Sequence, residues 1–134
     1  YGPRQNDTYA GVITKFLTRL AKNKPPIIFG TGKQTRDFIH VYDVSRAFFL
    51  AFRYNKTKFN IFNLGTGKST SINTLARYFL NSMKKYGIKL IHRKAIPGII
   101  IYNSMSNTKL KKRLGFTPSV SLKEGISDLV SNNL

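Results

Sequence analysis

The chain has 134 residues, 41% of them hydrophobic, which is enough material for one domain with its own core. It has no cysteine, which excludes a disulfide framework and a thiolate metal site, and its two histidines, His40 and His92, fit no metal-binding spacing. Its 23 lysines and arginines against 5 acids give a net charge of +18, which favours anionic partners: nucleic acid, a membrane surface or a phosphorylated molecule.

Other features of the sequence argue against some of these classes of partner. No stretch approaches the ~20 apolar residues of a membrane span, and residues 1–10 lack the apolar centre of a signal peptide, so we expect a cytoplasmic protein without a membrane partner. No zinc finger, RNP-type aromatic pair or GXXG loop is present, which disfavours nucleic acid. The first residue is not methionine, so we expect a piece or a processed form of a longer protein.

The first half of the chain predicts helix, strand, turn, strand and helix. Helical spacing of apolar residues predicts a helix over residues 10–22, which a Pro-Pro pair ends. Short apolar runs predict strands over 27–29 and 38–42. Asp43 is expected to be the N-cap of the next helix. The expected buried face of that helix consists of Val44, Ala47, Phe48, Ala51 and Phe52.

The middle of the chain predicts a strand, a glycine turn and a helix. Alternating side chains predict a strand over residues 59–64. Ser71 is expected to cap a helix, and Gly87 is expected to end it. The apolar face of this helix consists of Ile72, Leu75, Ala76, Phe79, Leu80 and Met83.

The last third predicts one more short strand and two helices. The strand is expected over residues 88–91, and a helix over 108–114 is expected to stop at Gly115. Ser121 and Glu124 form a capping box that starts the final helix. In sum, the sequence predicts a small α/β chain with four or five helices and several short strands.

The turn Gly30-Thr31-Gly32, followed by Arg36, is the first candidate site. Two close glycines let the backbone approach a ligand, and the planar fork of an arginine can bind a phosphate. The alternative is an ordinary β-turn with an exposed arginine, and the residue types alone leave both interpretations open.

A second phosphate motif fails. Residues 65–69, Gly-Thr-Gly-Lys-Ser, are similar to the end of a P-loop, but Phe62 stands where the pattern needs its first glycine. No acid follows until Glu124, so we interpret the tract as a turn before a helix. No Ser-His-Asp set or carboxylate pair is apparent either, so we assign no catalytic and no metal-binding residue.

Several tracts in fixed order resemble one family. They are 1–5 (Tyr-Gly-Pro-Arg-Gln), 9–13 (Tyr-Ala-Gly-Val-Ile), 28–44 (with Thr-Arg-Asp-Phe-Ile-His-Val), 59–67 (Phe-Asn-Ile-Phe-Asn-Leu-Gly-Thr-Gly), 114–118 and 122–126. Together they resemble the C-terminal substrate-binding half of NAD-dependent nucleotide-sugar epimerases and dehydratases, the extended short-chain dehydrogenase/reductase family, and above all its UDP-glucose 4-epimerase-like members. The resemblance implies one substrate-binding domain over 1–134, in which 1–8 are the remnant of a link to a Rossmann domain outside this chain.

The resemblance also implies roles for single residues. Arg36 would bind the diphosphate of a UDP-sugar, and Asp37 would brace the loop. The nucleotide would contact Gly11, Val12, Ile27, Ile28, Phe29 and Phe38. The cofactor loop and the catalytic Tyr-x-x-x-Lys of the family have no counterpart here in their usual context, so no cofactor site is expected in this chain, although the full-length family uses NAD.

The chain departs from the family at Ile96. Relatives usually carry Arg-Pro-Gly-Asp/Glu where this chain has Ile-Pro-Gly-Ile, and that arginine is a second diphosphate ligand. Its loss removes a charge-assisted contact, worth roughly 1.5–3 kcal/mol. A family aspartate also matches Ser106. We therefore expect a UDP-sugar-binding portion that is inactive alone, self-associates, and partners with a Rossmann domain. The alternative is a non-catalytic basic module for nucleic acid or another anion.

Overall fold

The fold was described from a computed structural model that covers residues 1–5, 11–56 and 59–133. In chain order its elements are α1 (Val12–Ala21), β1 (Ile27–Phe29), β2 (Thr35–Asp37), α2 (Val41–Phe52), β3 (Ser69–Ser71), α3 (Ile72–Ser82), β4 (Ile91–Arg93), α4 (Thr108–Leu114) and α5 (Leu122–Asn133). Five helices and short strands over these residues confirm the predicted α/β class.

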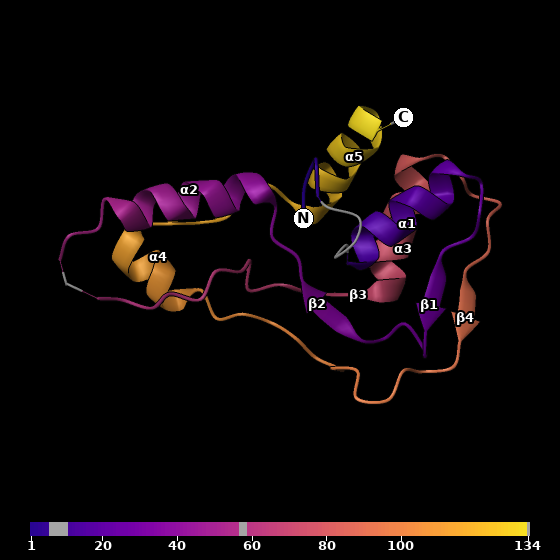
Figure 1. The fold of residues 1–134 in the computed structure, drawn as a ribbon, viewed down its shortest axis with the longest axis horizontal. Coiled ribbons are helices and arrows are strands. Elements are labelled where there is room, and N and C mark those ends of the chain that lie inside the picture. Colours follow the sequence, from indigo (N-terminus) through magenta and orange to yellow (C-terminus); the bar gives the residue numbers. More distant parts are fainter. Residues whose placement is uncertain (6–10, 57–58, 134) are drawn as a thin grey trace.

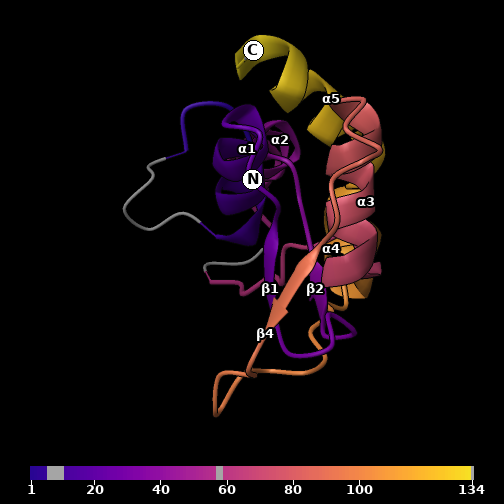
Figure 2. The same cartoon turned by 90° about the vertical axis from the view of Figure 1, so that its right-hand side faces the viewer.

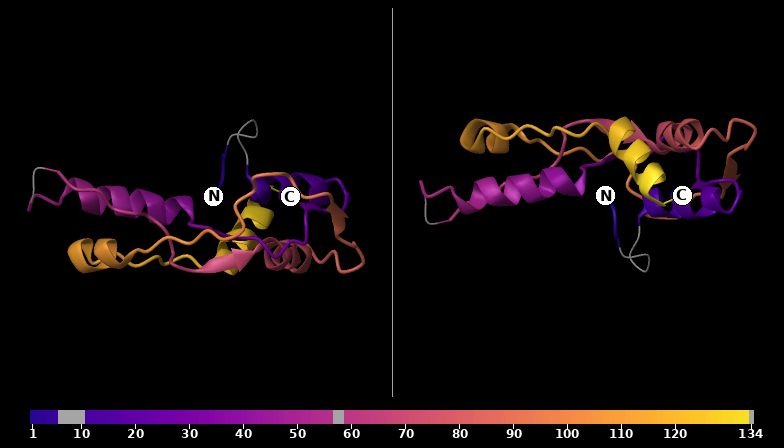
Figure 3. Two further views of the ribbon diagram at one scale, coloured as in Figure 1. Left: turned by 90° about the horizontal axis from the view of Figure 1, so that it is seen from below. Right: turned by 90° about the horizontal axis from the view of Figure 1, so that it is seen from above.

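The molecule is elongated and its two ends differ (Figure 1). Helices α2 and α4 lie at one end, and α1, α3, β1 and β4 lie at the other. At that second end the strands form a thin layer between α1 and α3 (Figure 2). Views from below and above show the same separation of α2 and α4 from the rest (Figure 3).

The strands form two small sheets over the described residues. Strands β1 and β4 pair in parallel, with Ile27 opposite Ile91. Strands β2 and β3 are antiparallel, with Arg36 opposite Thr70. A two-stranded sheet is marginal by itself, so helix packing must hold each pair in place.

The main core joins α1, α3, α5 and β1. Phe16 and Phe79 are almost fully buried and meet edge-to-face, with ring centroids 6.3 Å apart. The buried members of this core are Ile13, Phe16, Leu20, Ile28, Ile72, Leu75, Ala76, Phe79, Ile126, Leu129 and Val130. A second, smaller core at the α2–α4 end consists of Ala47, Leu110 and Phe116.

The caps predicted at Ser71, at Ser121 with Glu124, and at Gly115 are confirmed. The Ser71 hydroxyl accepts a bond from the Thr74 amide at 3.1 Å at the start of α3. At α5 the Ser121 amide donates to Glu124 Oε2 at 3.1 Å, and the Glu124 amide donates to Ser121 Oγ at 3.2 Å. Helix α4 has its predicted bounds, and Gly115 ends it with φ 65°. The predicted first helix is confirmed from Val12 onward, and its first residue lies outside the described part of the chain.

The predicted strand over residues 38–42 is wrong. Strand β2 occupies Thr35–Asp37, and α2 already begins at Val41. His40, predicted to lie within the strand, is the N-cap, and its Nδ1 accepts a bond from the Tyr42 amide at 3.3 Å. Asp43 is not the N-cap as predicted, because its carboxylate lies inside the first turn and binds a distant loop.

Three further element predictions need correction. Residues 59–64 form no strand, because they pair with no neighbouring strand of the described chain. Helix α3 ends before Gly87, with Met83 as its C-cap. The strand predicted over residues 88–91 lies at Ile91–Arg93, where it pairs with β1.

The apolar face predicted for α2 is largely open to solvent. Ala47 is buried, but Phe48 is 70% exposed and Phe52 is 89% exposed. Phe59 and Ile61, in the segment predicted as a strand, are exposed as well. The prediction that both α2 phenylalanines pack in a core is therefore wrong for this chain. The α2 face is defined here as Phe48, Phe49 and Phe52.

Candidate functional site

The glycine turn connects β1 to β2 and is tightly held. Gly30 and Gly32 have φ 76° and 73°, a region that disfavours other residues. The Gly30 amide donates to the Arg93 carbonyl at 2.8 Å, and Gln34 Nε2 donates to the Phe29 carbonyl at 2.8 Å. Asn73 donates two hydrogen bonds to the turn. Its backbone amide donates to the Gly32 carbonyl at 3.0 Å, and its side-chain Nδ2 donates to the Thr31 carbonyl at 2.9 Å.

We expect Gly32→Ala to destabilise the fold more than Gly30→Ala. Both alanines would adopt a left-handed backbone, at a cost of roughly 1–2 kcal/mol. A Cβ at Gly32 would also collide with the Asn73 side chain, whereas a Cβ at Gly30 would only touch Ala95 at 3.4 Å. Moving Asn73 breaks its bond to the turn and adds about 1 kcal/mol. Urea unfolding followed by circular dichroism measures both, and an equal loss would contradict the described turn.

Arg36 extends from β2 toward the segment that follows β4. Its Nη1 donates to the carbonyl of Ile100 at 2.7 Å and to that of Thr35 at 2.7 Å. The Thr35 amide also donates to the Ile101 carbonyl at 2.8 Å, so the segment is fixed alongside β2. A guanidinium has five N–H donors, and these two bonds both use Nη1, so the group is oriented and still has donors for an anion.

Asp37 braces the loops around β2, as predicted. Its Oδ1 accepts the amide of Thr66 at 2.9 Å, and its Oδ2 accepts the amides of Gly67 at 2.9 Å and Met105 at 3.2 Å. One carboxylate thus joins β2, the 65–67 turn and the segment before α4.

The predicted nucleotide contacts divide between two places. Ile27 and Phe29 line a mainly apolar cavity of about 460 Å³ against α1, whereas the Ile28 side chain is buried in the main core. Gly11 is the exposed N-cap of α1, and Val12 packs against the core.

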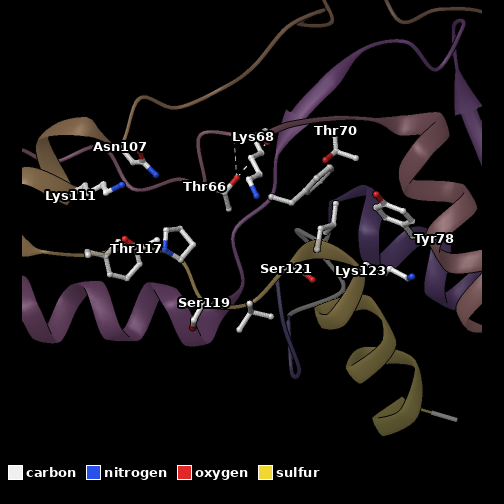
Figure 4. Close-up of a pocket in the computed structure, with 15 residues that line it drawn as sticks. Thr66, Lys68, Thr70, Tyr78, Asn107, Lys111, Thr117, Ser119, Ser121 and Lys123 are labelled. Carbon is white, nitrogen blue, oxygen red and sulfur yellow. Dashed lines mark hydrogen bonds between the residues drawn. The ribbon is translucent and has the colours of Figure 1, made fainter.

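Phe38 lies elsewhere. It packs against the main core and lines a different cavity, of about 610 Å³, together with Lys68 and Lys111 (Figure 4). The structure therefore brings Ile27 and Phe29 to one cavity but places Phe38 at another.

Comparisons with known proteins identify the family. Residues 1–65 match the NAD dependent epimerase/dehydratase family. Over 98% of its length the chain is 40% identical to the protein named "Putative UDP-glucose 4-epimerase" of Methanocaldococcus jannaschii, of which it covers 42%. This chain belongs to the NAD-dependent epimerase/dehydratase family. It spans about 42% of the length of that relative.

Two solved structures agree with the fold. The UDP-glucose 4-epimerase of Thermotoga maritima, crystallised with UDP-glucose, is 35% identical with a TM-score of 0.89, and the match covers 98% of this chain and 42% of that one. MoeE5, solved with UDP-glucose and NAD, is 27% identical with a TM-score of 0.82, and the match covers 98% and 43%. The described part of this epimerase-family chain is thus a partial domain of a known fold.

Asp43 is the important residue that sequence reasoning misread in this epimerase-family chain. Its side chain is fully buried and accepts the Ser119 amide at 3.0 Å, the Val120 amide at 3.0 Å and Arg46 Nη1 at 2.8 Å. Burial alone would raise the pKa of Asp43, but the bonds from Val120, Ser119 and Arg46 outweigh it and lower that pKa. No local pattern in the sequence could have indicated this role of Asp43, because its partner Ser119 lies 76 residues away.

The described residues contain neither a membrane-spanning helix nor a cluster of metal-binding side chains. No helix there is long and apolar enough to span a membrane. Histidine and acidic side chains in the same residues form no group of three or more that could hold a metal ion.

Proposed function

We propose that this chain is the UDP-sugar-binding, C-terminal part of a UDP-glucose 4-epimerase-like enzyme that uses NAD, and that it is inactive without the remainder. The observation that carries the proposal is Arg36, which is oriented beside a held glycine turn in a fold that matches an epimerase crystallised with UDP-glucose. A planar guanidinium suits the diphosphate of a UDP-sugar. Ile27 and Phe29 offer apolar surface for the base.

Isoleucine at position 96 cannot bind a diphosphate by charge, so we expect Arg36 to supply most of the diphosphate contact. Ile96 is 49% exposed and supplies no charge where relatives are expected to have an arginine. Binding should therefore be weak but depend strongly on Arg36.

Replacing Arg36 with alanine should weaken UDP-glucose binding by about tenfold or more. Loss of a charge-assisted bond costs roughly 1.5–3 kcal/mol, and 1.4 kcal/mol is a factor of ten. Calorimetric titration of UDP-glucose into the wild type and the variant measures the change. Arg77→Ala is the control, because Arg77 is exposed on α3 and its removal changes the net charge equally.

Two results would refute the proposed site. One is an equal loss of affinity in the Arg36 and Arg77 variants, which would mean that only net charge matters. The other is the absence of saturable binding in a wild-type chain that circular dichroism shows to be folded.

The described residues do not fit NAD. A dinucleotide loop leads from a strand into a helix, with a glycine pattern that lets the pyrophosphate approach the helix N-terminus. Here the Gly30–Gly32 turn joins two strands, and the 65–67 turn leads into β3. We therefore assign NAD to the remainder of the enzyme, whose Rossmann domain would cover the α2 face.

The net charge of +18 supports a second candidate, a basic module for nucleic acid. Filter binding to DNA and RNA across a salt series tests it. Tight binding at physiological salt, with a preference for one nucleic-acid sequence, would favour this candidate. A steep loss of affinity as salt rises, with no sequence preference, would mean that binding reflects only counterion release.

A further inference from the structure

A basic groove lies between the two ends of the molecule, and Arg36 is not among the residues that line it. It has a volume of about 610 Å³, within the range of small-molecule sites. Its walls come from the segment around β3, the start of α4, residues 116–121 and the start of α5 (Figure 4). We call it the lysine groove and define it by Lys68, Lys111 and Lys123.

The charge of the lysine groove is not neutralised by its own walls. No aspartate or glutamate is among the residues that line it. Within the described ranges the one ion pair of the chain joins Arg46 to Asp43, so none of the three lysines has an acidic partner there. Figure 4 shows Lys68 and Lys111 extending into the space from different walls. The start of α5 borders the same space, and there the Glu124 carboxylate already accepts the Ser121 amide at 3.1 Å.

The acids near the groove hold its walls rather than its lysines. Asp37 binds the amides of Thr66 and Gly67, and Asp43 binds those of Ser119 and Val120. Both wall segments are thus fixed before any ligand arrives, which reduces the entropic cost of binding.

The donors in the groove match a phosphate group. Lysine ammonium groups are point charges that bind phosphate, and the hydroxyls of Thr70 and Ser121 line the same space. Phe38 and Tyr78 add aromatic rings on which a base or sugar can stack. The lining residues surround one cavity and do not follow a stripe along the surface, which favours a compact ligand over a polymer.

We propose that the lysine groove is a second anion site, which binds a phosphate-bearing small molecule through Lys68 and Lys111. Arg36 does not line the groove, although Thr70, which does, lies opposite Arg36 in the pairing of β2 with β3. Lys68 belongs to the tract that is similar to the end of a P-loop. In the proposed site it contributes only its positive charge, and the backbone does not wrap around the phosphate as it does in a true P-loop.

Inorganic pyrophosphate is the probe for a calorimetric titration in phosphate-free buffer. We expect saturable one-to-one binding to Arg36→Ala, in which the diphosphate contact of the proposed UDP-sugar site is removed, and we expect this binding to weaken by at least about tenfold when Lys68→Ala/Lys111→Ala is added. The matched control is Lys24→Ala/Lys89→Ala, which removes the same charge from exposed positions outside the groove and should change affinity by less than about twofold.

A conservative variant separates binding from folding. Lys68→Arg/Lys111→Arg keeps both charges and should retain pyrophosphate binding. Equal weakening in the groove and control variants, or no saturation in Arg36→Ala, would overturn the proposal. So would displacement of pyrophosphate by a single-stranded oligonucleotide that binds more tightly at physiological salt. Retained pyrophosphate binding in Arg36→Ala keeps this result separate from the test of the UDP-sugar site.

Discussion

Asp43→Ala is expected to lower the free energy of unfolding by about 3 kcal/mol, because hydrogen bonds to a charged group are each worth roughly 1.5–3 kcal/mol and the amides of Ser119 and Val120 lose their acceptor. The carboxylate joins α2 to residues 119–120 and so connects the α2–α4 end to the segment that enters α5. Urea unfolding followed by circular dichroism measures the loss. Asp128→Asn is the control, because Asp128 is exposed on α5 and should change stability by less than about 0.5 kcal/mol.

The same carboxylate should make stability depend on acid pH. The folded pKa of Asp43 lies below its ordinary value near 3.8, so the unfolded chain binds the proton more readily. The stabilisation is therefore complete above the unfolded pKa and is lost as pH falls through the folded pKa. The difference in unfolding free energy between wild type and Asp43→Asn should shrink in this acid window. A constant difference from neutral to strongly acid pH would contradict the assignment.

Replacing Phe48 and Phe52 together with serine should abolish self-association of the isolated chain. These side chains are 70% and 89% exposed, and burying each against a second copy would contribute roughly 1.5–3 kcal/mol. Light scattering across a concentration series measures the oligomer. The control is Tyr86→Ser, because Tyr86 is an equally exposed aromatic away from the α2 face. A wild type that stays monomeric at high concentration would contradict this prediction.

Local signals in the sequence predicted most of the helices. Ser71, Ser121 and Gly115 act through bonds or backbone angles within a few residues, so their neighbours are enough to locate helix ends. The role of Asp37 as a brace was expected from the family resemblance and not from local signals, because its amide partners Thr66 and Met105 lie 29 and 68 residues away.

Features that depend on distant partners could not be predicted. The alternation over residues 59–64 is typical of a strand, but a strand forms only where a neighbour pairs with it. The position of β4 depends on its register with β1, and the role of Asp43 depends on residues 119–120. Phe48 and Phe52 have the spacing of a buried face, but spacing does not say whether the covering element is present.

The candidate site could be predicted only in part, because some of its side chains depend on distant partners. Arg36 and the glycine turn were found from residue types that bind phosphate. The side-chain direction of Phe38 depends on α3 and α5, which pack against it to form the main core. The lysine groove was not predicted, because its lysines come together only in the folded chain.

Backbone NMR mapping of UDP-glucose on the isotope-labelled chain tests the central claim most directly. We predict that the largest amide shifts occur at residues 27–36, around the glycine turn and Arg36, and that Arg36→Ala removes them. Largest shifts at residues 107–111 and 119–123, or no saturable shifts in a folded chain, would contradict the claim that this epimerase-family chain binds a UDP-sugar through Arg36.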